Sequence, residues 1–392
     1  DKIFNSFMQN AKNLLIRNRM LQIAIALFVV LTFWWLMIQP LNREVLVYQK
    51  HIWSSFYVAM SIFGTVYGLI VSRRFDGSKS LLGKIILAFS IGLFLQAFGQ
   101  IIYTYYLWFQ QNQTPYPSLG DIGYFGTIFA YIYGVFILAR YIGLTISFRS
   151  FFNKILTIII PLGILLFSYL FFLKGYKFDW SNPLRVFLDF GYPLGEAVYL
   201  SLAILILLFS KNVLGGVLRK PILLLVFALI IQYISDFYFL YQASKDTWYV
   251  GGIGDYLYTT AYFTMTFVII YIGDTFEKIR LENSKPNIIG AKVYHESNIE
   301  QLFNQILTEI IKRQVRITGS LAWQEVRKIP SILISDENTF KISITDNHQK
   351  TIDQLLQRYK NTFGDLAVQI SKNAVYDLTI QLPPEEVPDS LK

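Results

Sequence analysis

Cysteine is absent from this 392-residue sequence, and histidine occurs only at His51, His295 and His348. Without cysteine there is no disulfide, thiolate metal site, iron–sulfur cluster or cysteine nucleophile. None of the three histidines lies within an apolar run, which argues against a membrane-buried haem or a multi-histidine zinc site. We therefore expect no cofactor and no metal.

Charge is also scarce, because only 16% of the residues are charged while 54% are hydrophobic. A soluble domain usually carries about 25% charged residues. The deficit is concentrated before residue 276, where apolar runs recur that are long enough to cross a hydrocarbon core of about 30 Å. The fold class that this predicts is an all-α polytopic membrane domain, followed by a small cytoplasmic α+β domain.

We predict about eight transmembrane helices between two flanking regions. Residues 1–19 form a basic cytoplasmic segment, 20–275 the membrane domain, 276–296 a linker, 297–382 the cytoplasmic domain and 383–392 a tail. The expected spans lie near 20–39, 53–72, 83–108, 120–140, 153–173, 186–210, 220–241 and 252–274.

The distribution of Lys and Arg predicts the orientation of these spans. They gather beside the N-terminal segment and in the loops on the same side, whereas the loop 109–119 has no charge. By the positive-inside rule we expect a multi-pass protein of the cell membrane with both termini in the cytoplasm. The net charge of +9 is then explained by these loops, and we expect the lipid bilayer rather than nucleic acid as a partner.

An internal repeat relates several spans. Residues 84–108 align with 220–244, so that Gln96 matches Gln232 and Gln100 matches Asp236. The pattern Gly-acid-x-x-Tyr then occurs three times, and Trp53-Ser54-Ser55-Phe56-Tyr57 is a weak fourth copy without the acid. The three full copies place an acid and a tyrosine at Asp121 and Tyr124, Glu196 and Tyr199, and Asp255 and Tyr258. This predicts four helical hairpins, with the pattern opening the second helix of each, around a pseudo-symmetric centre.

The repeated acids are the candidate site residues, because ionisable groups within spans cost about 2.5–3.5 kcal/mol on insertion scales and usually face a cavity or a partner. We expect Gln100, Asp121, Glu196, Asp236 and Asp255 toward the exported ends of their helices. With Tyr124, Tyr199 and Tyr258 they would form an acidic, aromatic pocket suited to an organic cation.

A purely structural interpretation stands beside this one. An acid at the start of a helix caps free backbone N–H groups, and the tyrosine three residues later can donate to it. That explains Asp121 and Asp255, but fits Glu196 less well and leaves Asp236, near the C-terminal end of its span, without a cation within a helical turn. The glutamines are interpreted as hydrogen-bonding across helices.

Known catalytic patterns are not found. The sequence has no P-loop, Gly-x-Ser-x-Gly or His-Glu-x-x-His pattern, and the span 252–274 has no lysine for a retinal Schiff base. We therefore do not expect an enzyme.

The C-terminal region predicts a compact α+β unit. A helix is expected from about residue 299, broken at Gly319, followed by strands 331–335 and 340–344 and an amphipathic helix 349–374 interrupted at Gly364. It lacks the signatures of a histidine kinase or a diguanylate cyclase, so we interpret 297–382 as a docking or self-association domain.

The stretch Tyr116-Pro117-Ser118-Leu119-Gly120-Asp121-Ile122-Gly123-Tyr124 resembles a Tyr-Pro-Ser-x-x-Asp-x-x-Tyr motif. This motif is associated with prokaryotic multi-span membrane domains that often precede diguanylate cyclase or kinase modules in sensory proteins. The resemblance covers roughly residues 80–275 and implies a sensory function.

Three hypotheses follow for function. The first is a sensor or receptor-like protein in which a small cation or a proton acts at the exported pocket and the last span passes the change to the cytoplasmic domain. The second is a transporter or channel for protons, cations or small amines. The third is a structural membrane scaffold whose acids serve only as caps.

Overall fold

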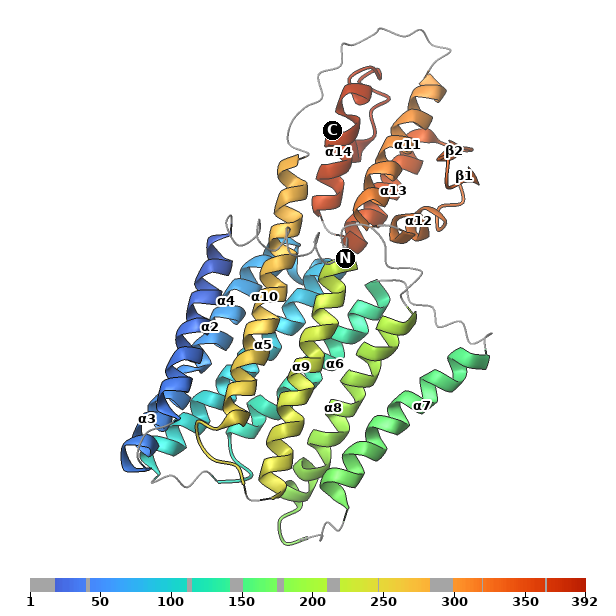
Figure 1. Cartoon of the computed structure of the whole chain (residues 1–392). Coiled ribbons are helices and arrows are strands. Elements are labelled where there is room, and N and C mark those ends of the chain that lie inside the picture. Colours follow the sequence, from blue (N-terminus) through green and yellow to red (C-terminus); the bar gives the residue numbers. More distant parts are fainter. Residues whose placement is uncertain are drawn as a thin grey trace, which may run out of the picture.

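The computed structural model describes residues 18–39, 43–110, 115–141, 151–174, 180–209, 219–245, 247–282, 299–318, 320–363 and 365–392. They form a bundle of long helices with a smaller tail module, residues 299–392, at one end (Figure 1). We name the end of the bundle beside the tail module the proximal end and the opposite end the distal end. Most of the predicted N-terminal segment 1–19 lies outside the described residues.

The first half of the bundle contains α2 (Arg19–Ile38), α3 (Arg43–Phe56), α4 (Val58–Arg74), α5 (Leu81–Phe109) and α6 (Gly120–Tyr141). The second half contains α7 (Phe151–Ser168), α8 (Pro183–Phe209), α9 (Arg219–Ser244) and α10 (Ile253–Glu282). Polar caps define some of the helix starts. Asn18 accepts from the backbone N–H groups of Met20 and Leu21 at α2, and Ser80 from that of Gly83 at α5.

Seven helices within the described ranges are long and apolar enough to cross a membrane, which indicates a multi-pass membrane protein. They match seven of the eight expected spans: Arg19–Ile38, Val47–Arg74, Leu81–Phe109, Gly120–Tyr141, Pro183–Leu208, Lys220–Gln242 and Ile253–Thr275. The span expected at 153–173 contains a shorter apolar stretch, Ile155–Phe171. There the α-helix ends at Ser168 and a π-helical turn, η2, follows over Tyr169–Leu173.

Six helices form a closed ring in the order α4, α5, α6, α8, α9 and α10, because each packs against the next and α10 packs against α4. Three of the described helices in the bundle lie outside the ring: α2 packs against α10, α3 against α2 and α5, and α7 against α8. The sequence repeat aligns α5 with α9 and α6 with α10, so the ring consists of two equivalent three-helix sets. The ring can therefore be described as two halves, α4 to α6 and α8 to α10.

The repeated pattern opens two of the three helices in which it was expected to do so. Gly120-Asp121 lies at the start of α6, and Gly254-Asp255 lies in the first turn of α10. Gly195-Glu196 instead lies midway along α8, which begins at Pro183. The prediction was wrong here because the helix continues through Pro193 toward the distal end and places Glu196 deep in the bundle.

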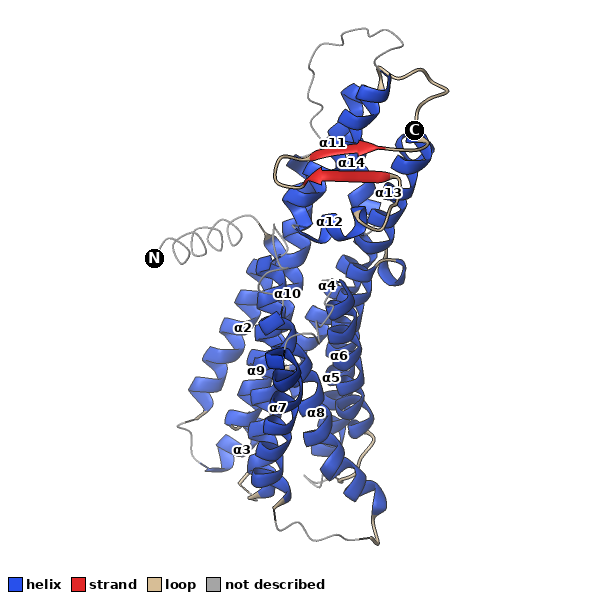
Figure 2. Cartoon of the chain, turned by 90° about the vertical axis from the view of Figure 1, so that its right-hand side faces the viewer, coloured by secondary structure: helices blue, strands red, loops and turns tan. Residues whose placement is uncertain are grey.

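The tail module has the expected order of elements. It contains α11 (Ile299–Thr318), α12 (Ser320–Val326), an antiparallel pair of strands β1 (Ile332–Asp336) and β2 (Lys341–Ile344), α13 (His348–Phe363) and α14 (Asp365–Thr379) (Figure 2). The apolar positions of α11 are buried, among them Phe303, Ile306 and Ile310. The C-terminal tail also packs: η4 (Asp389–Leu391) lies against α13, where Asp353 accepts from the backbone N–H of Ser390 at 2.8 Å.

The tail module touches the proximal end of the bundle. The rings of Tyr141, at the end of α6, and Phe363, at the end of α13, lie 5.9 Å apart edge to face, and α13 also contacts α5. The helix α10 continues to Glu282, past the expected boundary at residue 275, and rises from the bundle toward the tail module (Figure 1). The rest of the expected linker, 283–296, lies outside the described residues.

Candidate functional site

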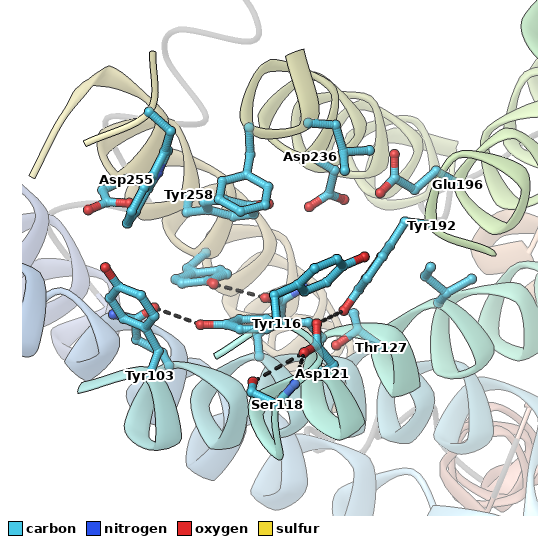
Figure 3. A pocket seen from close by; sticks show the side chains of 18 of the residues that line it. Tyr103, Tyr116, Ser118, Asp121, Thr127, Tyr192, Glu196, Asp236, Asp255 and Tyr258 are labelled. Carbon is cyan, nitrogen blue, oxygen red and sulfur yellow. Dashed lines mark hydrogen bonds between the residues drawn. The ribbon is translucent and has the colours of Figure 1, made fainter. Parts of the chain in front are cut away.

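A cavity of about 470 Å³ lies within the helical ring, toward its distal end. Five of the ring helices, α5, α6, α8, α9 and α10, contribute to its wall, together with Tyr57 just before α4, and the segments before α6 and α10 cover its distal side. Its lining is dominated by tyrosines, at positions 57, 103, 106, 116, 124, 131, 192, 199, 258 and 262. Figure 3 shows the arrangement of the acidic and aromatic side chains around this space.

The structure brings together every site residue proposed from the sequence. Gln100, Asp121, Tyr124, Glu196, Tyr199, Asp236, Asp255 and Tyr258 all line this single cavity. They come from five different helices and are separated by up to 158 positions in the chain, between Gln100 and Tyr258. The repeat therefore gathers equivalent positions at one place.

The charge of the lining is of one sign. Asp121, Glu196, Asp236 and Asp255 are its acids, whereas Lys, Arg and His do not occur among the described residues that line it. Glu196 and Asp255 are each 4% exposed. A buried carboxylate needs a counter-charge or hydrogen-bond donors, so the partners of each acid decide its role.

Asp121 is a structural cap. One of its oxygens, Oδ2, accepts from the backbone N–H of Ser118 at 2.7 Å and from the Ser118 hydroxyl at 3.1 Å. The other, Oδ1, accepts from the Tyr192 hydroxyl at 2.8 Å. Both oxygens are thus engaged at the positive end of α6, where an acid is favoured, and the capping interpretation is supported for this residue.

Asp255 has a comparable but less complete set of partners. Its Oδ2 accepts from the backbone N–H of Gly251 at 2.7 Å and from the hydroxyl of Ser54 at 3.3 Å. The first bond fixes the turn before α10, in which Gly251 has the positive φ of 68° that glycine tolerates best. The second joins α10 to α3, the helix just before α4, because Ser54 belongs to α3.

Tyrosine hydroxyls donate hydrogen bonds to Gln100 and to Asp236, two residues that the repeat aligns. Gln100 Oε1 accepts from the hydroxyls of Tyr57 at 2.7 Å and Tyr124 at 2.9 Å. At the matching position in the other half, Asp236 Oδ2 accepts from the hydroxyl of Tyr199 at 3.3 Å, and Tyr258 also donates to this carboxylate. Each tyrosine was expected to donate to the acid one turn before it. The structure shows that Tyr124, Tyr199 and Tyr258 reach a neighbouring helix instead.

The two halves differ in how the central group is completed. In the first half, Gln100 also donates through Nε2 to the carbonyl of Ser54 at 3.0 Å, which leaves a neutral and satisfied group. In the second half, Gln232 donates to both oxygens of Asp236, at 3.0 and 3.2 Å. Interhelical bonding is confirmed for Gln100 and for Gln96, which accepts from Tyr262 at 3.0 Å, whereas Gln232 bonds within its own helix.

Glu196 is the acid without a protein partner. In the repeat, Glu196 aligns with Ser54, and each lies three residues before the repeated tyrosine. Among the described residues it has no hydrogen bond and no ion pair, although it is almost completely buried. Its carboxyl group lies beside that of Asp236, and both face the cavity (Figure 3). The second half of the ring is therefore acidic where the first is neutral.

Aromatic residues of the connecting segments, Tyr116 and Trp248, line the distal side of the cavity. Tyr116 donates to Asp189 Oδ1 at 2.7 Å, and the guanidinium of Arg185 lies 5.7 Å from the centre of its ring. Burial and the bond to Asp189 raise the pKa of Tyr116 above its usual value, so this hydroxyl stays protonated at neutral pH. Arg185 is paired with Asp189 at 3.8 Å and does not line the cavity.

Several lining residues were not proposed from the sequence. Tyr57 and Tyr192 bind Gln100 and Asp121; the only signals for them were the weak fourth copy of the repeat and the neighbouring Pro193. The hydroxyls of Tyr103 and Tyr131 and the indole N–H of Trp248 are buried, and none of them has a hydrogen-bond partner in the part of the chain that the structure describes. No sequence pattern marks these three.

The lining places carboxylates beside aromatic ring faces. No group of three or more acidic or histidine side chains able to hold a metal is found in the described ranges. A carboxylate pair surrounded by aromatic rings binds amines through ion pairing and cation–π attraction, which strengthens to about 2 kcal/mol or more when the cation is desolvated.

Gln100 is expected to be essential for stability because three groups depend on it. Gln100→Leu leaves the hydroxyls of Tyr57 and Tyr124 and the Ser54 carbonyl without their partner. We expect a loss of about 2–4 kcal/mol in the free energy of unfolding. Tyr124→Phe removes only one of these bonds and should lose about 1 kcal/mol. Thermal unfolding in detergent measures both, and equal stability of Gln100→Leu and wild type would contradict this account.

Comparisons with protein-family models, curated proteins and solved structures find no match to this chain. The resemblance of residues 80–275 to sensory membrane domains therefore stays a prediction.

Proposed function

We propose that this chain is a receptor-like membrane protein that binds a small organic cation, an amine, in the cavity of its helical ring and transmits binding to the tail module. The observation that carries the proposal is the Glu196–Asp236 pair. Glu196 is 96% buried and has no protein partner in the described ranges, and the lining supplies no basic side chain. An ammonium group would provide the counter-charge and the donors that this pair lacks.

The size and walls of the cavity support a molecular ligand over a proton alone. A volume of about 470 Å³ lies within the range of small-molecule pockets. Ten tyrosines, with Phe239 and Trp248, offer ring faces and hydroxyls to a cation and to its carbon skeleton. A proton site would need neither this volume nor this lining.

The membrane arrangement follows from the same features. We propose eight crossings, with α7 as the shortest, and a cell membrane that places the distal end outside. Exposed basic residues of the proximal end, Arg73, Arg74, Lys79 and Arg140, support a cytoplasmic location for that end and for the tail module. The cavity would then take its ligand from outside.

Two direct connections could carry a change from the cavity to the tail module. The helix α10 lines the cavity with Asp255, Tyr258 and Tyr262 and leads at its other end toward the tail module. The helix α6 lines it with Tyr124 and Tyr131 and ends at Tyr141, whose ring contacts Phe363. A ligand that binds one conformation of the bundle more tightly than another shifts the protein toward that conformation. If the two conformations differ in the position of α6 or α10, the tail module is displaced as well.

The absence of cysteine makes this coupling measurable. Arg74→Cys and Tyr376→Cys place single labels on exposed positions of the bundle and the tail module in an otherwise cysteine-free chain. We expect saturating butylamine to change the distance distribution between spin labels at these sites. The same labels in Glu196→Gln should show no change. An unchanged distribution in the labelled wild type at saturation would rule out the receptor-like proposal.

A transporter for the same cation is the second candidate. It is favoured by the two equivalent halves around a central cavity and by the position of Glu196 midway along its helix. Against a transporter, buried apolar side chains that include Phe89, Val135, Leu138 and Leu229 lie between the cavity and the proximal end. Flux of labelled amine into proteoliposomes would identify a transporter; binding without flux would identify a receptor.

A further inference from the structure

We infer that the ligand is a linear diamine or polyamine, with one ammonium group at the Glu196–Asp236 pair and a second at Asp255. This rests on the proposed function and deepens it, because it names the class of amine. The two acidic positions lie on opposite sides of the cavity, with Tyr258 between them (Figure 3).

The first step is that each position has unused capacity for a cation. Glu196 has no protein partner among the described residues and lies beside Asp236. At Asp255, both bonds that the structure shows, from Gly251 and Ser54, use the same oxygen, Oδ2. The other oxygen is left for a ligand, whereas both oxygens of Asp121 are engaged.

The second step concerns the separation of the two positions. Glu196 belongs to α8 and Asp255 to α10, and α9 lies between these helices in the ring. Since the axes of packed helices lie about 8–10 Å apart, the axes of α8 and α10 lie roughly 15 Å apart. The side chains of Glu196 and Asp255 point inward from these helices and leave a space between their carboxyl groups. One ammonium group does not fill this space, whereas two ammonium groups joined by several methylene groups can reach both carboxyl groups.

The third step is the wall between the two acids. Phe239 contacts both Tyr258 and Trp248, with ring centres 6.2 and 6.0 Å apart, and all three line the cavity. These rings form a continuous apolar and aromatic surface beside which a methylene chain can lie. Deep in the cavity, the hydroxyl of Tyr131, a residue only 1% exposed, lacks a partner in the described part of the chain and can accept from an ammonium group after a small rotation.

The test compares two amines of equal chain length, butylamine with one charge and putrescine with two, and adds spermidine as a longer triamine. Calorimetric titration of the full chain in detergent, at constant ionic strength, would use butylamine, putrescine and spermidine. We expect putrescine and spermidine to bind at least about ten-fold more tightly than butylamine. Asp255→Asn should lower the affinity for putrescine to that for butylamine and leave the affinity for butylamine unchanged. The control is Asp274→Asn, which removes a carboxylate of the same helix outside the cavity. It should change neither the affinity for putrescine nor that for butylamine.

The outcomes separate this inference from the proposed function. If butylamine binds as tightly as putrescine, or if Asp255→Asn weakens both equally, the second ammonium position is wrong while amine binding stands. If none of the three amines binds, both proposals fail. The comparison of the three amines on the wild-type protein decides the matter even if Asp255→Asn does not fold.

Discussion

Glu196→Gln is expected to abolish amine binding without lowering stability. The substitution keeps the shape of the side chain and removes the charge that would pair with an ammonium group. Since Glu196 has no hydrogen bond or ion pair in the described residues, no protein contact is lost, and the free energy of unfolding should stay the same or rise by up to about 2 kcal/mol. Binding of butylamine should weaken by roughly one hundred-fold or more.

The matched control is Asp121→Asn, an acid of the same cavity with the opposite signature. It loses charge-assisted bonds from Ser118 and from the helix start, so we expect about 1–2 kcal/mol less stability and nearly unchanged binding. Thermal unfolding with and without butylamine measures both properties, since a ligand at about 100 times its dissociation constant stabilises by about 2.7 kcal/mol. A destabilised Glu196→Gln that still responds to butylamine would contradict the assignment of this residue.

Gly123→Ala is expected to cause a large loss of stability, because this glycine lies where two ring helices pack backbone against backbone. A Cβ at this position of α6 would lie 2.4 Å from the carbonyl oxygen of Leu95 and 2.7 Å from the backbone nitrogen of Gly99 on α5. Because both are backbone atoms, the two helices must separate, and we expect a loss of about 3 kcal/mol or more. The cavity should be distorted as well, because both helices line it.

Gly126→Ala provides the control for this prediction on the same helix. Its Cβ would meet only the side chain of Leu95, at 3.4 and 3.6 Å, which is an ordinary contact. Alanine also favours the helix by about 1 kcal/mol over glycine, so stability should be unchanged or slightly higher. Similar melting temperatures of the two variants in detergent would show that α5 and α6 do not need to approach so closely.

The helices and the site residues could be predicted from the sequence because both leave periodic signals. Long apolar runs predicted seven of the described spans, and the repeat selected eight residues that all line one cavity. The alternation in 331–344 predicted the two strands of the tail module. In each case the signal lies in neighbouring residues of the sequence.

The roles within the site could not be predicted because they depend on contacts between distant segments. Asp121 and Asp255 share one sequence pattern but differ in their distant hydrogen-bond donors. The hydroxyl of Tyr192 donates to Asp121, and that of Ser54 donates to Asp255. Glu196 differs because its helix begins at Pro183 instead of at the repeated glycine. The order of helices in the ring, which makes α8 and α10 neighbours of α9, has no trace in the local pattern.

The most direct test of the central claim, that the cavity is a site for an amine, is equilibrium dialysis of labelled putrescine against the full chain in lipid nanodiscs, with Glu196→Gln in parallel. The account predicts saturable binding of one putrescine per chain to the wild-type protein and no saturable binding to the variant. Equal binding to both proteins, or none to the wild type at millimolar concentrations of putrescine, would contradict it.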